Sequence, residues 1–314
     1  MKYVCPHENN KCNIVIVACP PKDVFDNCNK SIKKCLYESS VNSNIIHKQH
    51  SVLVATFLEH NIKVINLFDH IDIKSLKEKY NDKELGNIIF TRDPIICTPK
   101  GVIVGRFKEE IRRKETDIII AVLKRLKIPI LYTVNNEDSY IEGGDYIPAG
   151  SHSFIAIGIR TNMNGVQELM NKNLFGTDYV AVIKYPVDGN MHTIHLDCYM
   201  GIVNKKYAIL WDVVTKFLVV DEYKSNKLVR KDIPIDIYLV SLGYEIILVP
   251  SEWQSKYSCN LLDIGNNKIL TQDHYITHIL KQKGLSPIYI TYNEIHKMYG
   301  GIRCTTQVIS RNKK

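Results

Sequence analysis

The sequence of 314 residues has no long apolar run and no leader-like start. No stretch reaches the ~18 uninterrupted apolar residues that indicate a membrane-spanning helix, and short runs such as DIIIAVL and YEIILVP fit core elements. The N-terminus, MKYVCPHENNKCNIVIVACPPKD, has no charged region followed by an apolar segment, so we expect no signal peptide. With 45% hydrophobic and 24% charged residues the composition is typical of a globular protein. We therefore expect a cytoplasmic protein without a membrane partner.

Motifs for metals, disulfides and phosphates are also missing. The nine cysteines are odd in number and widely spread, and no two are spaced CxxC. This usage fits reduced thiols better than a disulfide framework, and it disfavours a structural zinc site. Neither GxGxxG nor a Walker motif occurs, which argues against a phosphate-binding loop. The net charge is +8, but the lysines are scattered and form no aromatic-interleaved stripe, so we predict no nucleic-acid partner.

What the sequence does contain is a repeat of helix, strand and strand pair. The first round has a helix at 47–60, a strand at 63–68 and a pair at 87–107, and the second follows at 108–126, 128–134 and 140–160. Three later rounds begin with the helical segments 164–174, 234–243 and 274–284. The pattern predicts an α/β fold with antiparallel hairpins rather than a doubly wound parallel sheet.

The fifth round lacks its last strand. The N-terminal run CNIVIVA, residues 12–18, is an apolar segment that would supply this strand and close a ring. We therefore predict a single catalytic domain over residues 1–314, in which the N-terminal segment 1–45 contributes the closing strand.

Polar residues recur at one place in each round, which we predict to lie inside the first strand of the pair. Asp93, Asp145 and Asp197 follow each other at equal intervals, and Asn260 and Cys304 hold comparable positions. If the rounds are arranged around an axis, these residues meet at one centre. Cys304 follows Gly300 and Gly301, and glycines would let a backbone or a ligand approach a nucleophilic thiolate.

Taken singly, Cys304, His195, Glu142 and the aspartates are each more often structural than reactive. Together they describe a nucleophile, a proton carrier and a carboxylate that fixes the imidazole. Asp93 and Asp197 exceed what a Cys–His pair requires, and buried acids need a positive partner. A planar guanidinium can bind two carboxylates at once, so the centre fits a guanidino substrate. The surplus negative charge disfavours a cysteine peptidase, whose oxyanion needs donors.

The segments FTRD, EGGD, GIRT, HLD and GGIRCTT occur in this order between residues 90 and 306. The set resembles the guanidino-group-modifying enzyme superfamily, and arginine deiminases most closely, from about residue 45 onward. The resemblance implies a five-bladed pseudosymmetric α/β propeller of ββαβ modules, without cofactor or catalytic metal. It also implies that Cys304 attacks the guanidinium carbon, Asp93 and Asp197 clamp its nitrogens, His195 transfers protons and Glu142 orients His195.

Three further matches concern the amino-acid end of a substrate. Asn87, Arg112 and Arg160 stand where arginine deiminases bind the α-carboxylate and backbone, so the resemblance implies substrate binding by all three. The chain departs from the family pattern at Arg303, where a histidine is usual, and at Tyr299, where an arginine often stands. It also lacks the helical insertion that commonly precedes the TRD motif.

The reaction predicted from this resemblance is hydrolysis of L-arginine to L-citrulline and ammonia through an S-amidino intermediate on Cys304. An amidinotransferase or a dimethylarginine hydrolase would use the same Cys/His/acid site, because only the C–N bond that faces His195 differs. A catalytically silent arginine-binding protein is the alternative from another class. We expect a small guanidino compound as the partner, and the sequence leaves a homo-oligomer open.

Overall fold

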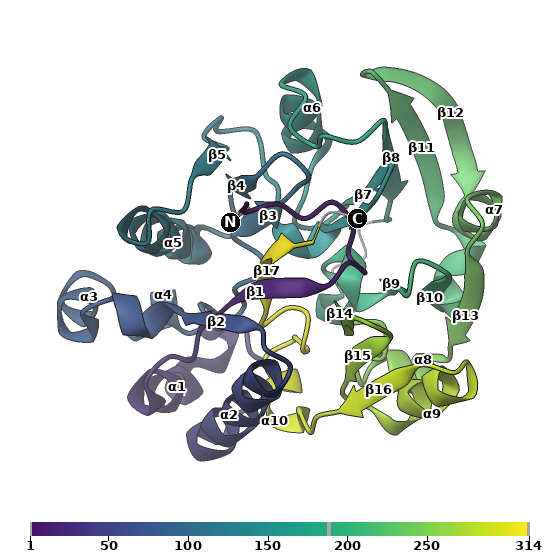
Figure 1. The fold of residues 1–314 in the computed structure, drawn as a ribbon. Helices are drawn as coiled ribbons and strands as arrows, with labels where there is room; N and C mark the ends of the chain where they lie inside the picture. The colour runs from purple at the N-terminus through teal and green to yellow at the C-terminus, as the bar shows by residue number, and fades with distance from the viewer. Residues whose placement is uncertain (1, 187–189, 313–314) are drawn as a thin grey trace.

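The computed structural model describes residues 2–186 and 190–312, and their strands form five small sheets (Figure 1). The strands are β1 (Cys12–Val17), β2 (Lys63–Asn66), β3 (Ile95–Cys97), β4 (Val102–Val104), β5 (Ile130–Thr133), β6 (Tyr146–Ala149), β7 (His152–Ile157), β8 (Tyr179–Lys184), β9 (Met200–Val203), β10 (Tyr207–Trp211), β11 (Val219–Lys224), β12 (Lys227–Pro234), β13 (Glu245–Val249), β14 (Leu262–Gly265), β15 (Lys268–Thr271), β16 (Ser286–Tyr289) and β17 (Gln307–Arg311). The fold is therefore mixed α/β, as the sequence predicted.

The helices of the described residues connect these strands and lie mostly at the outside of the molecule (Figure 1). They are α1 (Lys22–Cys28), α2 (Ser43–Glu59), α3 (Ile73–Lys79), α4 (Asp82–Leu85), α5 (Arg113–Arg125), α6 (Met163–Asn171), α7 (Ile235–Ser241), α8 (Ser251–Gln254), α9 (His274–Gln282) and α10 (Asn293–His296). The predicted helices at 47–60, 108–126 and 164–174 correspond to α2, α5 and α6, so the helical half of the repeat is confirmed.

Each sheet contains the same three-stranded unit, an antiparallel pair of strands and a third strand parallel to the middle one. The sheet orders are β3-β4-β5, β14-β15-β16, β9-β10-β13, β17-β1-β2 and, with two added strands, β6-β7-β8-β11-β12. Parallel strands need a crossover, and the connecting helices supply it. The middle strand of a unit is covered on both faces, which explains fully buried runs such as Val102–Val104.

One sheet joins the two ends of the chain. Strand β1 pairs antiparallel with β17 and parallel with β2, so it lies between them. Figure 1 shows β1 and β17 side by side near the middle of the molecule. The side chains of β1 from Ile14 to Val17 are almost fully buried, because the strand is covered on both faces.

The hairpin of β11 and β12 was not predicted. It pairs β11 with β8 and extends that sheet to five strands. Ser225 and Asn226 at its turn both have left-handed backbones, with φ of 47° and 63°, as a tight two-residue hairpin requires. The strand β12 could not be predicted from its charged sequence, because its side chains are mostly exposed and show no apolar period.

Among the residues that the structure describes, no helix combines the length and the apolar character needed to cross a bilayer.

Candidate active site

The predicted site residues lie in turns at the starts of the hairpins, not inside the strands as predicted. Asp93 precedes β3, Glu142 precedes the 3-10 turn Gly143–Asp145, and His195 precedes the 3-10 turn Leu196–Cys198. Cys304 lies three residues before β17. Backbone hydrogen bonds from Asp145 to Glu142 and from Cys198 to His195, both 3.1 Å, close these turns. A turn can aim consecutive side chains at one centre, whereas a strand would send alternate side chains to opposite faces.

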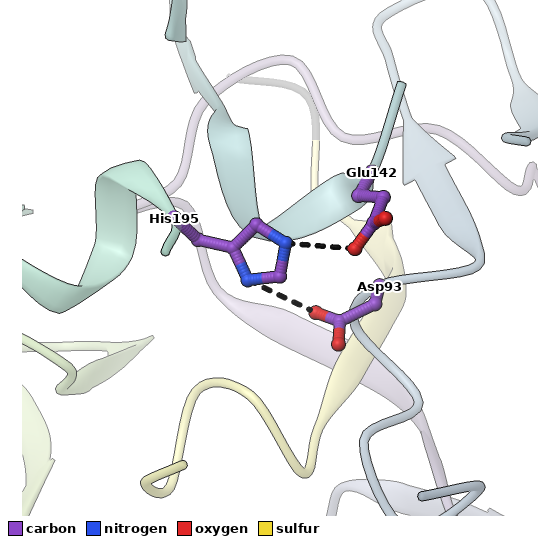
Figure 2. A group of neighbouring side chains, drawn as sticks. All are labelled: Asp93, Glu142 and His195. Atoms are coloured by element: carbon purple, nitrogen blue, oxygen red, sulfur yellow. Dashed lines mark hydrogen bonds and ion pairs between the residues drawn. The ribbon is translucent and has the colours of Figure 1, made fainter. Parts of the chain in front are cut away.

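His195 lies between two carboxylates (Figure 2). Its Nε2 lies 2.9 Å from Oε2 of Glu142, and its Nδ1 lies 3.7 Å from Oδ1 of Asp93. Burial opposes the charged imidazolium, but Asp93, the hydrogen bond to Glu142 and the charge of Asp145 outweigh it and raise the pKa of His195 to about 10. At neutral pH the ring is therefore a cation with two N–H groups, which suits a proton donor.

Cys304 is held next to Asp197 by an asparagine. Asn260 Nδ2 donates to Sγ of Cys304 over 3.0 Å, and Asn260 Oδ1 accepts from the Cys304 backbone N–H over 3.2 Å. The same sulfur lies 3.9 Å from Oδ1 and 4.0 Å from Oδ2 of Asp197. Asn260 was recognised as the equivalent position in the repeat but not as a site residue, and here it contacts the sulfur directly.

The two expected clamp carboxylates are each bound by a buried arginine of the chain itself. Arg112 Nη1 lies 2.6 Å from Oδ2 of Asp93, and Arg303 Nη1 lies 2.9 Å from Oδ2 of Asp197. In each aspartate Oδ1 is the oxygen nearer the reactive groups. Oδ1 of Asp93 has no hydrogen-bond partner among the described residues, and Oδ1 of Asp197 faces sulfur. Each carboxylate thus has one anchored oxygen and one oxygen left for a ligand.

Arg112, predicted to bind substrate, lines the cavity and also makes several contacts with the protein. Its Nε and Nη2 each donate over 2.9 Å to the two oxygens of Glu115, and Nη2 also reaches the carbonyl of Asn87 over 3.4 Å. Burial raises the pKa of Glu115 to about 7, although Arg112 opposes this. These contacts make Arg112 an anchor of Asp93.

Arg160 differs, because its guanidinium has donors to spare. It is only 2% exposed, and Nε and Nη1 have no hydrogen-bond partner among the described residues. Its Nη1 lies 3.9 Å from Oε1 of Glu109 and 4.0 Å from Oε1 of Glu142. Burial disfavours the Glu142 carboxylate, but Arg160 and His195 outweigh it and lower the pKa of Glu142. A buried arginine with unused donors is suited to binding a carboxylate.

These residues surround a small cavity of about 20 Å³. Six of the predicted residues line it: Asn87, Asp93, Arg112, Arg160, His195 and Cys304. Glu142 and Asp197 do not line the cavity and contact it through His195 and Cys304. Asn87 also donates from Nδ2 to the carbonyl of Cys35 over 2.9 Å, so its side-chain amide is already used. Apolar walls come from residues such as Phe90 and Met298.

The glycines of the two GG pairs serve packing more than ligand access. A Cβ at Gly300 would lie 2.2 Å from the Phe90 ring, and a Cβ at Gly301 would lie 2.7 Å from Oδ1 of Asn260. A Cβ at Gly144 would lie 2.6 Å from Cγ of His195. The expectation that Gly300 and Gly301 admit a ligand or backbone is therefore corrected, since side chains that support Cys304 fill this space.

Asp93, Glu142 and His195 also offer one ligand atom each within 4.8 Å of one another (Figure 2). Metal binding would require His195 to give up a proton that both carboxylates stabilise. We assign no metal to these residues, because the arrangement matches an imidazolium between two acids.

Comparisons with known proteins identify the family of the chain. A family model described as arginine deiminase matches residues 71–311. An uncharacterized protein of Bacillus subtilis (strain 168), YkgA, is 23% identical over 314 residues, covering 99% of this chain and 96% of the Bacillus protein. The arginine deiminase of Oenococcus oeni is 26% identical over 323 residues, covering 89% of this chain and 77% of that enzyme.

Solved structures show a similar fold at low identity. The N-terminal domain of ArgZ, a cyanobacterial arginine dihydrolase, has a TM-score of 0.72 at 15% identity, covering 95% of this chain and 98% of that one. The dimethylarginine dimethylaminohydrolase of Pseudomonas aeruginosa, complexed with citrulline, has a TM-score of 0.68 at 17% identity, covering 94% and 98%. SxtG, an amidinotransferase from Microseira wollei, has a TM-score of 0.69 at 12% identity, covering 99% and 98%. Because the family model spans far more than half of its residues, the chain belongs to the arginine deiminase family of enzymes.

Proposed function

We propose that the chain hydrolyses the guanidino group of L-arginine to give L-citrulline and ammonia. The observation that carries this proposal is the single cavity where Cys304, His195, Asp93 and Arg160 meet. We further propose that the five sheets are the blades of an α/β propeller formed by one domain over residues 1–314, with the cavity near its axis. The free state of all nine cysteines supports a reducing compartment, so we propose a cytoplasmic location.

In this proposal the substrate guanidinium lies against Oδ1 of Asp93, which lines the cavity, and approaches Asp197, which lies beyond the cavity wall next to the sulfur of Cys304. The substrate α-carboxylate would bind the unused donors of Arg160. The buried surroundings strengthen both charge pairs and hold the guanidinium carbon against sulfur. The cation also favours the thiolate of Cys304, to which Asn260 Nδ2 already donates.

The reaction then proceeds in two displacements. The thiolate forms an S–C bond with the guanidinium carbon, and the C–N bond to the leaving nitrogen breaks as the His195 imidazolium donates a proton, releasing ammonia. The neutral His195 next accepts a proton from water, whose oxygen attacks the same carbon. The C–S bond breaks, the thiolate is restored and citrulline leaves. The covalent step divides one difficult substitution into two easier ones.

The test is product analysis with purified protein and L-arginine, using citrulline and ammonia assays. We expect equal amounts of both products from the wild type and none from Cys304→Ala. Cys259→Ala is the matched control, because this thiol is equally buried but packs in an apolar cluster with Val203 and Leu261. Undiminished turnover in Cys304→Ala would end the proposal.

Parallel incubations with dimethylarginine, and with arginine plus glycine, distinguish the related reactions. Dimethylamine would identify a dimethylarginine hydrolase, and ornithine with an amidinated amine would identify an amidinotransferase. Arginine binding without any product would identify a silent binding protein.

A further inference from the structure

A chain of buried charges runs from the N-terminal segment to the proposed nucleophile through Arg303. The three nitrogens of this guanidinium each have their own acceptor. Nε lies 3.0 Å from Oε1 of Glu8, Nη1 lies 2.9 Å from Oδ2 of Asp197, and Nη2 lies 2.8 Å from the carbonyl of Tyr146. Arg303 is 1% exposed, so no solvent competes for these contacts.

An arginine suits this place because its planar fork holds several acceptors in a fixed geometry. The three acceptors come from three separate segments, so the guanidinium plane cannot turn without breaking a bond. With Oδ2 tied to Nη1, the Asp197 carboxylate is held beside Cys304, with its two oxygens 3.9 and 4.0 Å from the sulfur. Burial raises the pKa of Asp197, and Arg303 counters this.

Glu8 supplies the other end of the arrangement. Burial opposes its ionisation, but Arg303, Arg92 and Arg311 outweigh burial and lower the pKa of Glu8 to about 2. An ionised Glu8 balances the charge that Arg303 brings into the core, so that Arg303 need not withdraw from Asp197.

We propose that Glu8 and Arg303 are positioning residues, which fix the Asp197 carboxylate so that a cationic ligand is held beside the sulfur of Cys304. The identity of the cation as a guanidino group rests on the proposed function. In this arrangement the N-terminal segment contributes to the site through Glu8, although Glu8 is far from Cys304 in the sequence.

The test compares two alkylating reagents of similar size, the cationic chloroacetamidine and the neutral iodoacetamide. Labelling of Cys304 is followed by peptide mass spectrometry, and the ratio of the two rates reports the carboxylate beside the sulfur. We expect Arg303→Met to lower the cation preference about tenfold, because an unanchored, buried Asp197 turns away or takes up a proton. If Arg303 acted only as a nearby positive charge, its removal would raise the preference, and that result would overturn the proposal.

A second pair of variants covers the case in which Arg303→Met does not fold. Glu8→Ala removes both the acceptor of Nε and the balancing charge and should lower the ratio, whereas Glu8→Gln keeps the oxygen without the charge and should lower it less. Unchanged ratios in both would overturn the proposal. Arg311→Met is the matched control, because Arg311 is an equally buried arginine 3.9 Å from Glu8 whose Nη1 bonds the carbonyls of Asn10 and Asp263.

This measurement needs no turnover. A wild type that shows the cation preference but forms no citrulline would contradict the proposed hydrolysis and leave the positioning role standing.

Discussion

At the scale of the residue, the site is built from acids that each have one oxygen bound by the protein. Arg112 and Arg303 take Oδ2 of Asp93 and Asp197. Such anchoring fixes the rotamer of a carboxylate before the ligand arrives, and preorganised charge is what stabilises a transition state most effectively. Arg112 also lines the cavity, so this anchoring adds to the substrate-binding role predicted for it.

The Asp93→Asn variant tests this division of labour. Its amide oxygen can still accept from Arg112, so the volume and the anchor remain, but the charge facing His195 and the substrate is lost. We expect kcat/KM for arginine to fall at least about 100-fold, with an unchanged far-UV circular dichroism spectrum. Asp117→Asn, on the exposed face of α5, is the control that should keep full activity. Comparable activity in the two variants would remove Asp93 from the mechanism.

His195 should make stability depend on pH in a defined direction. Its folded-state pKa is raised from 6.5 to about 10, so the stabilisation is complete below pH 6.5 and is lost as the pH rises through about 10. We expect the difference in unfolding free energy between the wild type and His195→Gln, measured in urea, to shrink steadily over this window. A difference that stayed constant or grew with pH would show that the imidazolium is not the stabilised form.

At the scale of the element, the recurring unit explains how short, irregular segments hold the reactive side chains in fixed positions. Each reactive side chain lies in a turn that leads directly into a buried strand, so the strand fixes where the turn ends. For Cys304 this strand is β17, whose partner β1 comes from the opposite end of the chain. Stability of β1 should therefore matter to the site even though none of its residues lines the cavity.

Ile16→Ala tests how much β1 contributes to the stability of the fold. The side chain of Ile16 is fully buried in β1, and its truncation should cost about 2–5 kcal/mol of unfolding free energy. Leu58→Ala, in α2 and 58% exposed, should change that quantity by less than about 0.5 kcal/mol. Urea titrations of both variants measure these values, and equal losses would contradict the assigned burial.

At the scale of the whole molecule, the repeat was readable from the sequence because its units obey local rules. A helical period of apolar residues indicated α5 and α6, and short apolar runs indicated strands such as β4 and β13. The family could be recognised for another reason, because five short motifs occur along the chain in the order expected for arginine deiminases. The hairpin of β11 and β12 was missed because β12 is mostly exposed and carries no such period.

The ion pairs of the site could not be predicted in the same way. Nothing local in the sequence couples Arg303 to Glu8 or to Asp197, because the three residues come from distant rounds of the repeat. Arg112 and Glu115 stand three residues apart, a spacing that favours pairing, yet this spacing does not show that Asp93 shares the same guanidinium. Such networks depend on tertiary closure, which only the fold specifies.

The pairing of β1 with β17 gives that closure a consequence for the reactive thiol. The sulfur meets Asn260 and Asp197 only when the last strand has docked against the first. In a chain that has not completed this pairing, Cys304 would therefore lack these contacts and would react as an ordinary thiol. The reactivity that we propose for Cys304 would arise only when β1 and β17 have paired.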